Sequence, residues 1–218
     1  MSLLEVTLRD STERDFAAVK RFFLDNHSDY NKTRGDHLLL ERIEAHHFVI
    51  IERAGAIVGV AGTFRHGPGG IYREAGATRI TLNGFGLQRV THYARSLHEH
   101  LLEPGYRDYY STVVDANEAS KHNMAKVGFV DWPDPPDGLS KQRSAAVAPD
   151  KRIDFMRLPE ACLSAHAKAL LALLADPHLQ RHERADPARR ETARLHVKLA
   201  ILERARAEVE RLAAGTPT

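Results

Sequence analysis

The chain lacks most of the features that point at once to a compartment or a partner. It holds a single cysteine, Cys162, so no internal disulfide can form, and we expect a reducing, cytoplasmic setting. The longest purely apolar run, residues 169–175, is far shorter than the ~20 residues that cross a bilayer. The first residues also lack a basic segment followed by an apolar one. We therefore expect no membrane partner.

Charge of one sign is also missing. The 31 Lys and Arg residues nearly balance the 29 Asp and Glu residues, which leaves a net charge of +2. No overall field therefore favours a nucleic acid, and only a local patch could do so. The 13 histidines show neither a His-Glu-x-x-His motif nor cysteine pairs at the spacing of a metal site, so we expect no metal.

What the chain does contain is an alternation of β-rich and helical segments. Strand-like runs are expected at 4–9, 47–52, 56–64, 77–82, 109–114 and 153–158, with a hairpin turn around Gly55. Helical patterns are expected from Phe16 to Phe23, around 38–43 after a polar loop, and over 88–102. This order predicts an α/β or α+β layered fold.

A glycine-containing turn joins the strand expected at 77–82 to the helix that follows. Gly84 and Gly86 leave backbone N–H groups uncovered at the start of that helix. Such groups, together with the helix dipole, can receive an anion such as a pyrophosphate. The two glycines alone are equally consistent with a simple tight turn.

A second pattern follows the strand expected at 109–114. Asn117 closes the strand, a short helix follows, and Lys126, Gly128 and Phe129 lead into a new strand. Together the two patterns resemble those of the GNAT acetyltransferase family, whose second motif reads Asn-x-x-Ala-x-x-x-Tyr-x-Lys-x-Gly-Phe. The spacing is intact, but Ser120 stands at the Ala position and Met124 at the Tyr position.

The resemblance implies a mixed, splayed β-sheet flanked by helices and an acyl-coenzyme A donor, with acetyl as the expected acyl group. It also implies that two segments bind the donor, namely the glycine-containing turn with its flanking residues and the second motif. The implied residues are Leu82, Gly84, Phe85, Gly86, Leu87, Gln88 and Arg89, joined by Asn117 and Ser120. Thr81 departs from the family pattern, which has Gln or Arg at that position.

The resemblance also implies catalytic roles. Asn117 would hold the amide arm of the donor, and Glu74 is the expected general base, with Asp115 and His66 as alternatives. The plain alternative for each is a surface charge beside a turn. A thioether has no proton to give, so Met124 is expected to pack. The leaving group then needs no acid, or its proton comes from one of four other residues: Tyr93, Tyr110, His122 or Asn123.

Beyond Pro159 the composition turns rich in Ala, Leu and Arg, and we expect a helical hairpin extension. A first arm over 160–175 ends at Asp176, and a second arm is expected after residues 186–187. Its apolar stripe would pack on the domain or on a second copy in a homodimer; the stripe comprises Leu195, Leu199, Leu202, Val209 and Leu212. The boundaries expected are 1–158 for the GNAT-like domain and 159–218 for the extension.

Three basic residues, Arg190, Arg194 and Lys198, recur at every fourth position of the expected second arm. They form either a solvated helix face or a site for RNA. The leading hypothesis is transfer of an acyl group from acyl-coenzyme A to an amine of a small molecule, whose identity the sequence does not predict. One alternative keeps the fold but takes an aminoacyl group from charged tRNA held by these three residues. Another is a GNAT-shaped binding protein without turnover.

Overall fold

The structure, a computed structural model, describes residues 3–26, 43, 48–82, 85–102, 105–139, 152–180 and 194–215. The strands are β1 (Leu3–Asp10), β2 (Phe48–Arg53), β3 (Ala56–His66), β4 (Tyr72–Ile80), β5 (Asp108–Val114), β6 (Val130–Asp131), β7 (Ile153–Arg157), β8 (His178–Gln180) and β9 (Arg194–Leu199). The α-helices are α1 (Phe16–Asp25), α3 (Leu87–Leu102), α4 (Glu118–Lys126), α6 (Cys162–Ala175) and α7 (Arg206–Ala213). Short 3₁₀ turns are η1 (Glu13–Asp15), η2 (Pro68–Gly70) and η4 (Ala200–Ala205).

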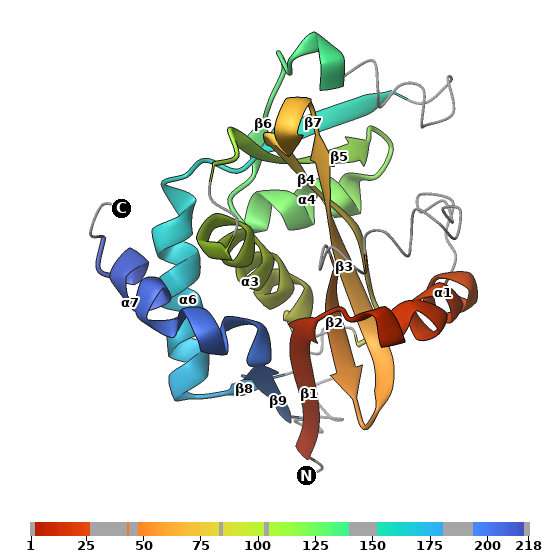
Figure 1. The fold of residues 1–218 in the computed structure, drawn as a ribbon, viewed down its shortest axis with the longest axis vertical. Coiled ribbons are helices and arrows are strands. Elements are labelled where there is room, and N and C mark those ends of the chain that lie inside the picture. The colour runs from red at the N-terminus through yellow and green to blue at the C-terminus, as the bar shows by residue number, and fades with distance from the viewer. Residues whose placement is uncertain are drawn as a thin grey trace, which may run out of the picture.

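The strands form one nine-stranded sheet in the order β6-β7-β5-β4-β3-β2-β1-β9-β8. Most neighbours are antiparallel, but β4 and β5 run parallel, and so do β1 and β9. Helices α3, α6 and α7 lie on one side of the sheet, and α1 lies on the other (Figure 1). The mixed sheet flanked by helices confirms the fold class predicted from the sequence.

The hairpin expected around Gly55 is present between β2 and β3. Ala54 and Gly55 both have positive φ angles, 48° and 79°. A two-residue turn with both residues in the left-handed region matches the twist of the strands that it joins. Further along the pair the register shifts between Ile51 and Glu52.

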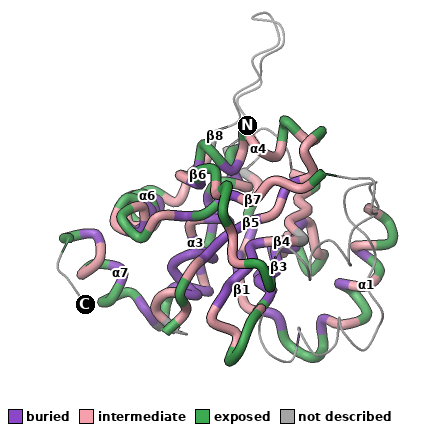
Figure 2. The backbone as a smooth tube through the Cα atoms, turned by 90° about the horizontal axis from the view of Figure 1, so that it is seen from above, coloured by how far each residue is buried: buried purple, intermediate pink, exposed green. Residues whose placement is uncertain are grey.

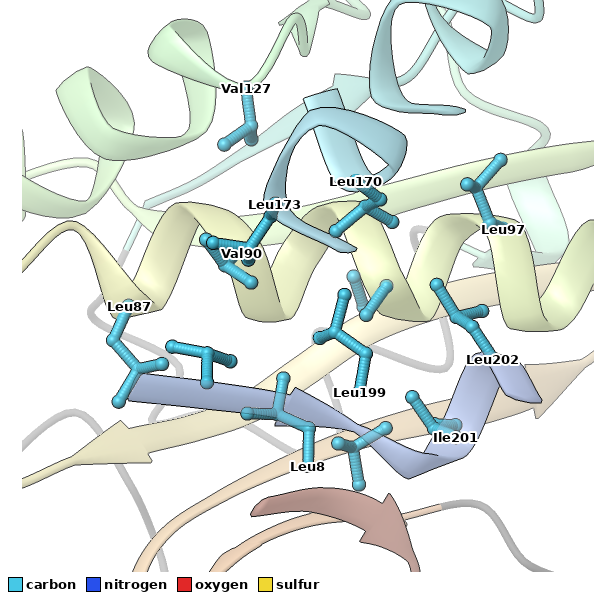
Figure 3. Packing of buried hydrophobic residues seen from close by; sticks show 14 of the residues in the cluster. Leu8, Leu87, Val90, Leu97, Val127, Leu170, Leu173, Leu199, Ile201 and Leu202 are labelled. Carbon is cyan, nitrogen blue, oxygen red and sulfur yellow. The ribbon is translucent and has the colours of Figure 1, made fainter. Parts of the chain in front are cut away.

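The main core lies between the sheet and helix α3. Figure 3 shows Leu8 of β1 and Leu199 of β9 turned toward helix α3, whose Leu97 belongs to the same cluster. Helix α6 closes the same cluster from outside with Leu170 and Leu173. Helix α3 is therefore enclosed on nearly all sides, and the tube in Figure 2 is largely coloured as buried along it.

The predicted helical hairpin after Pro159 is correct for its first arm, which is α6, but wrong for residues 194–199. These residues form strand β9, which pairs in parallel with β1. Leu195, Val197 and Leu199 are buried, whereas Lys198 is exposed, so the burial has a period of two. A spacing of four between Leu195 and Leu199 fits both a helix and a strand, which explains the error.

The C-terminal part therefore belongs to the same sheet as the rest of the chain. Of the predicted stripe, Val209 and Leu212 lie on the α-helix α7, and Leu202 lies in the 3₁₀ turn η4. The expected break at residues 186–187, the polar loop at 30–35 and most of the helix expected at 38–43 fall outside the described residues. None of the described helices has the length and apolarity needed to cross a bilayer.

Candidate functional site

Strands β4 and β5 part in the middle of the sheet. They pair only from Tyr72 with Asp108 to Ala75 with Ser111. Beyond that point β4 continues to Ile80 beside β3, and β5 continues beside β7. The pairing of Ala75 with Ser111 is therefore the vertex of a V-shaped opening in the sheet.

The free limb of β4 carries a β-bulge. Gly62 of β3 pairs with Gly76, and Val60 pairs with Arg79, so β4 has one residue more than β3 over this stretch. A bulge bends a strand and increases its twist, and this one lies just beyond the point where β4 parts from β5. Gly76 permits the close packing here, since a Cβ at this position would lie 2.7 Å from Cε2 of Phe64.

The glycine-containing turn leads from β4 into helix α3. Gly86 has a φ of 71°, and a Cβ placed on it would meet no atom within 4 Å. Its carbonyl accepts hydrogen bonds from the N–H groups of Arg89 and Val90, so Gly86 precedes the first turn of α3. The first N–H groups of such a helix have no acceptor within the helix and lie next to open space at Gly86.

Around this turn, the side chains named by the sequence prediction divide into two groups. Phe85 and Leu87 are buried in the main core and Leu82 packs against it, so they anchor the turn. Gln88 is half-buried and accepts from Nδ2 of Asn123 on α4 at 3.4 Å, while Arg89 is exposed. Gly84 lies outside the described residues. Of the predicted loop residues that the structure describes, Gln88 and Arg89 are the ones with polar side chains at the start of α3.

Asn117 is the N-cap residue of α4, directly after β5. Its Oδ1 accepts a hydrogen bond from the backbone N–H of Ser120 at 3.1 Å. Such a cap satisfies one of the unpaired donors at the start of the helix. No hydrogen bond joins the side-chain NH₂ group of Asn117 to another residue that the structure describes. The predicted role of Asn117 in holding a donor stays a prediction.

Asp115 is held by Lys121. Lys121 Nζ lies 2.7 Å from Asp115 Oδ1 and also 2.7 Å from Asp154 Oδ2. The hydrogen bond from Lys121 is the main reason that the pKa of Asp115 is lowered. A carboxylate with a lowered pKa is a poor proton acceptor near neutral pH, which makes Asp115 the weaker of the two acidic candidates.

Glu74 lies one residue before the vertex and is buried, with 1% of its side chain exposed. It pairs in register with Phe64, which packs in the cluster beneath α1, so its side chain is on the α1 face of the sheet. His66 Nε2 is 2.8 Å from Glu74 Oε2, and the hydroxyl of Thr112 on β5 donates to Glu74 Oε1. Glu74 is therefore not a surface charge; it is a buried carboxylate that joins β3, β4 and β5 at the vertex.

Two aspects of this arrangement were missed from the sequence. The sequence predicted a strand from Ala77, but β4 begins at Tyr72. The charged residues Arg73 and Glu74 are not typical of a buried strand, yet both are buried here. The contact with His66 follows from the β3–β4 hairpin, in which His66 pairs with Tyr72. A hairpin predicted through the turn at Gly67, with His66 opposite Tyr72, would have placed His66 next to Glu74.

The candidates for a proton donor are not gathered at the opening. Met124 is buried in the main core, as expected for a residue that packs. The Tyr93 ring lies 4.3 Å from that of His166, and His122 is exposed on α4. Two candidates lie nearer to it. Asn123 donates to Gln88 at the start of α3, and Tyr110 is buried on β5 with its ring 6.2 Å from that of His66.

The basic trio does not form the helix face that was predicted. Arg194 and Lys198 lie on strand β9, and Arg190 is outside the described residues. Within the part of the chain that the structure describes, no group of three histidine, cysteine or acidic side chains could hold a metal ion.

Comparison with known proteins gives a clear likeness in structure and none in sequence. No family profile and no curated protein matches the sequence. Among solved structures, yncA of Salmonella typhimurium, with its cofactor acetyl-CoA, matches with a TM-score of 0.52 at 20% identity over 70% of this chain and 92% of its own. A GNAT-family acetyltransferase of Streptococcus pneumoniae matches with a TM-score of 0.51 at 13% identity over 71% and 99%.

A third match is the diaminobutyrate acetyltransferase EctA of Paenibacillus lautus, in complex with L-2,4-diaminobutyric acid and coenzyme A. Its TM-score is 0.50 at 16% identity, over 71% of this chain and 95% of that one. Identities this low establish the architecture alone. The splayed mixed sheet, with the glycine turn and α3 beside its opening, has the fold of the GNAT acetyltransferases.

Proposed function

We propose that the protein transfers an acyl group, acetyl in the simplest case, from an acyl-coenzyme A to an amine of a small molecule. The observation that carries this proposal is the parting of β4 from β5 beyond Ala75 and Ser111, beside the start of α3. This arrangement offers an extended backbone edge and a helix N-terminus side by side. A coenzyme A molecule carries the two matching parts, an amide-containing arm and a pyrophosphate.

The residues present fit such a donor. Beyond the vertex, residues 76–80 of β4 have no strand partner on the β5 side among the described residues. An amide-containing arm can pair with this edge as an added strand would. The first turn of α3 after Gly86 suits the pyrophosphate, because its N–H groups and the helix dipole favour an anion. Asn117, at the end of β5, would donate to the arm through its NH₂ group, since its Oδ1 already caps α4.

The acceptor belongs on the α1 face of the vertex, where Glu74 and His66 lie. The bound diaminobutyric acid of EctA supports a small amine as the class of acceptor. Attack on a thioester requires a neutral amine and hydrogen-bond donors for the charge that develops on the carbonyl oxygen. A backbone N–H on the free limb of β4 could supply such a donor. Positioning at the vertex would provide much of the remaining acceleration.

The proposal is tested by calorimetric titration with acetyl-CoA of the wild type and two glycine variants. Gly86 and Gly215 both have positive φ angles, 71° and 75°, and a Cβ would meet no atom within 4 Å at either position. Gly86→Ala and Gly215→Ala should therefore lose similar stability, roughly 1–2 kcal/mol from left-handed strain. Only Gly86→Ala, which distorts the start of α3, should weaken acetyl-CoA binding, by about tenfold or more.

Turnover is then measured by the release of free thiol from acetyl-CoA in the presence of amino acids, diamines and polyamines. Binding with turnover supports the proposal. Binding without turnover across the panel would favour a GNAT-shaped binding protein. Absence of acetyl-CoA binding would refute the proposed donor, and salt-sensitive binding of bulk tRNA in its place would favour an aminoacyl-tRNA donor.

A further inference from the structure

We propose that His66, oriented by Glu74, is the residue that removes the proton from the acceptor amine. This inference rests on the acyl transfer proposed above and concerns one step of it. It exchanges the roles expected from the sequence, in which Glu74 was the base and His66 an alternative.

The burial of the two side chains separates their roles. Only 1% of the Glu74 side chain is exposed, compared with 24% of the His66 side chain. Both carboxylate oxygens are already bonded, Oε1 by the hydroxyl of Thr112 and Oε2 by the imidazole of His66. A carboxylate so enclosed cannot also touch an amine that arrives from solvent. The imidazole is the member of the pair that can reach it.

The contact with Glu74 also sets which ring nitrogen carries the lone pair. A carboxylate accepts hydrogen bonds, so the 2.8 Å contact places the proton on Nε2 of His66. The lone pair is then on Nδ1, which accepts no hydrogen bond from the described residues. A buried anion at the other nitrogen stabilises the imidazolium that forms when Nδ1 takes a proton. Glu74 is thus a positioning residue, and His66 the catalytic one.

Aromatic side chains fix the imidazole from the β5 side. The ring of Tyr110 lies 6.2 Å from that of His66. The ring of Tyr110 also lies 5.7 Å from that of Trp132 and 6.0 Å from that of Phe155, measured between ring centroids. Tyr110 lies on β5, Phe155 lies on β7, and Trp132 directly follows β6. Together these rings give His66 a rigid apolar wall on one side. Such a wall limits competition from water for the imidazole.

The protons and bonds balance as follows for a primary amine that arrives as an ammonium ion. One proton passes from the ammonium nitrogen to Nδ1 of His66 and from there to solvent. The neutral nitrogen then attacks the thioester carbonyl, so a C–N bond forms and the C–S bond breaks. The second proton leaves the nitrogen and ends on the thiolate sulfur of coenzyme A. The products are an amide, the free thiol and one released proton.

Kinetics of His66→Ala test the role of the imidazole. With the amine that gives the fastest turnover in the panel, kcat should fall by about 100-fold or more, while acetyl-CoA affinity stays within about twofold. Added imidazole should restore part of kcat, because the cavity left by the ring can hold it. His178→Ala is the matched control, since His178 also contacts a carboxylate, Asp176 at 2.8 Å, but lies on β8 at the far edge of the sheet. It should keep wild-type kcat.

A spectroscopic measurement tests the same idea without an acceptor. The ¹⁵N shifts of the His66 ring should show the proton on Nε2 in the wild type and a mixture of tautomers in Glu74→Leu. A proton on Nδ1 in the wild type would overturn the proposal, as would a His66→Ala enzyme with unchanged kcat or with a loss that imidazole does not restore. Loss of acetyl-CoA binding in the wild type would instead refute the proposed function, so the two failures are distinguishable.

Discussion

His92, in the middle of helix α3, should make the protein sensitive to acid. Only 2% of this residue is exposed, and neither ring nitrogen has a hydrogen-bond partner among the described residues. Its ring lies 6.4 Å from that of Phe129, measured between ring centroids. Burial is the main cause that lowers its pKa from 6.5 to about 3. The folded protein therefore holds this histidine neutral where the unfolded chain would protonate it.

The size of the effect follows from this difference in pKa. Below pH 6.5 the unfolded chain binds a proton at His92 that the folded protein does not bind, so stability falls as the pH falls. Each pH unit costs about 1.4 kcal/mol until the pH nears the folded-state pKa of about 3. Between pH 7 and pH 4 the loss is about 3 kcal/mol, a large part of the 5–15 kcal/mol typical of a folded protein.

The test is urea unfolding of the wild type and of His92→Leu at pH 7, 6, 5 and 4. At pH 7 the variant should be within about 1 kcal/mol of the wild type, since replacing an unpaired polar group by an apolar one of similar size is nearly neutral. At pH 4 the variant should be the more stable by about 3 kcal/mol. Other groups titrate in both proteins, so their contributions cancel in the difference between the two free energies of unfolding.

His166 supplies the contrast. It is also buried, but Ser96 Oγ contacts its Nδ1 at 2.7 Å and its Nε2 donates to the carbonyl of Val127 at 2.8 Å. His166→Leu should cost about 1–3 kcal/mol at pH 7, because it leaves buried partners unpaired. Two stability curves that stay parallel from pH 7 to pH 4 for the wild type and His92→Leu would refute the reasoning about His92.

Three further predictions concern the opening and its flanks. Asn117→Ala should lower the free energy of unfolding by about 1 kcal/mol through loss of the α4 cap, whereas Asn117→Asp should restore stability in urea but not acetyl-CoA affinity measured by calorimetry. Gly76→Ala should lower the free energy of unfolding by about 1–3 kcal/mol in the same assay, because the new Cβ meets Phe64. Gly138→Ala should be nearly neutral, because a Cβ there meets no atom within 4 Å, and equal effects of the two variants would contradict the packing argument. Lys121→Ala should raise the pKa of Asp115 toward its usual value in an NMR titration, and an unchanged pKa would contradict the contribution of this ion pair.

The predictions from sequence succeeded where one local pattern decided the structure. The glycine turn into α3, the hairpin at Ala54 and Gly55, and the Asn117 cap each depend on a few neighbouring residues. The glycine turn and the motif that begins at Asn117 are the elements that carried the resemblance to the GNAT fold. The failure at β9 arose where the pattern was ambiguous, because Leu195 and Leu199 fit both a strand and a helix and the choice depends on pairing with distant β1.

Buried charges were the other source of error. A surface charge was the plain alternative for Glu74, but strand β4 buries Glu74 together with Arg73. Helix α3 buries Arg95 and Glu99 in addition to its apolar residues. Arg95 donates to the hydroxyl of Thr63, and Glu99 pairs with Arg73 at 3.4 Å. Such contacts join residues far apart in the chain, so local periodicity cannot predict them.

The most direct test of the donor site is hydrogen–deuterium exchange of the backbone amides with and without acetyl-CoA. Proposed binding in the opening predicts slower exchange at three places, the free limb of β4 over 76–80, the first turn of α3 after Gly86, and the start of α4 after Asn117. Exchange at β8 and β9 should stay unchanged. Protection confined to other parts of the sheet, or none at all at saturating acetyl-CoA, would contradict the assignment of this opening as an acyl-coenzyme A site.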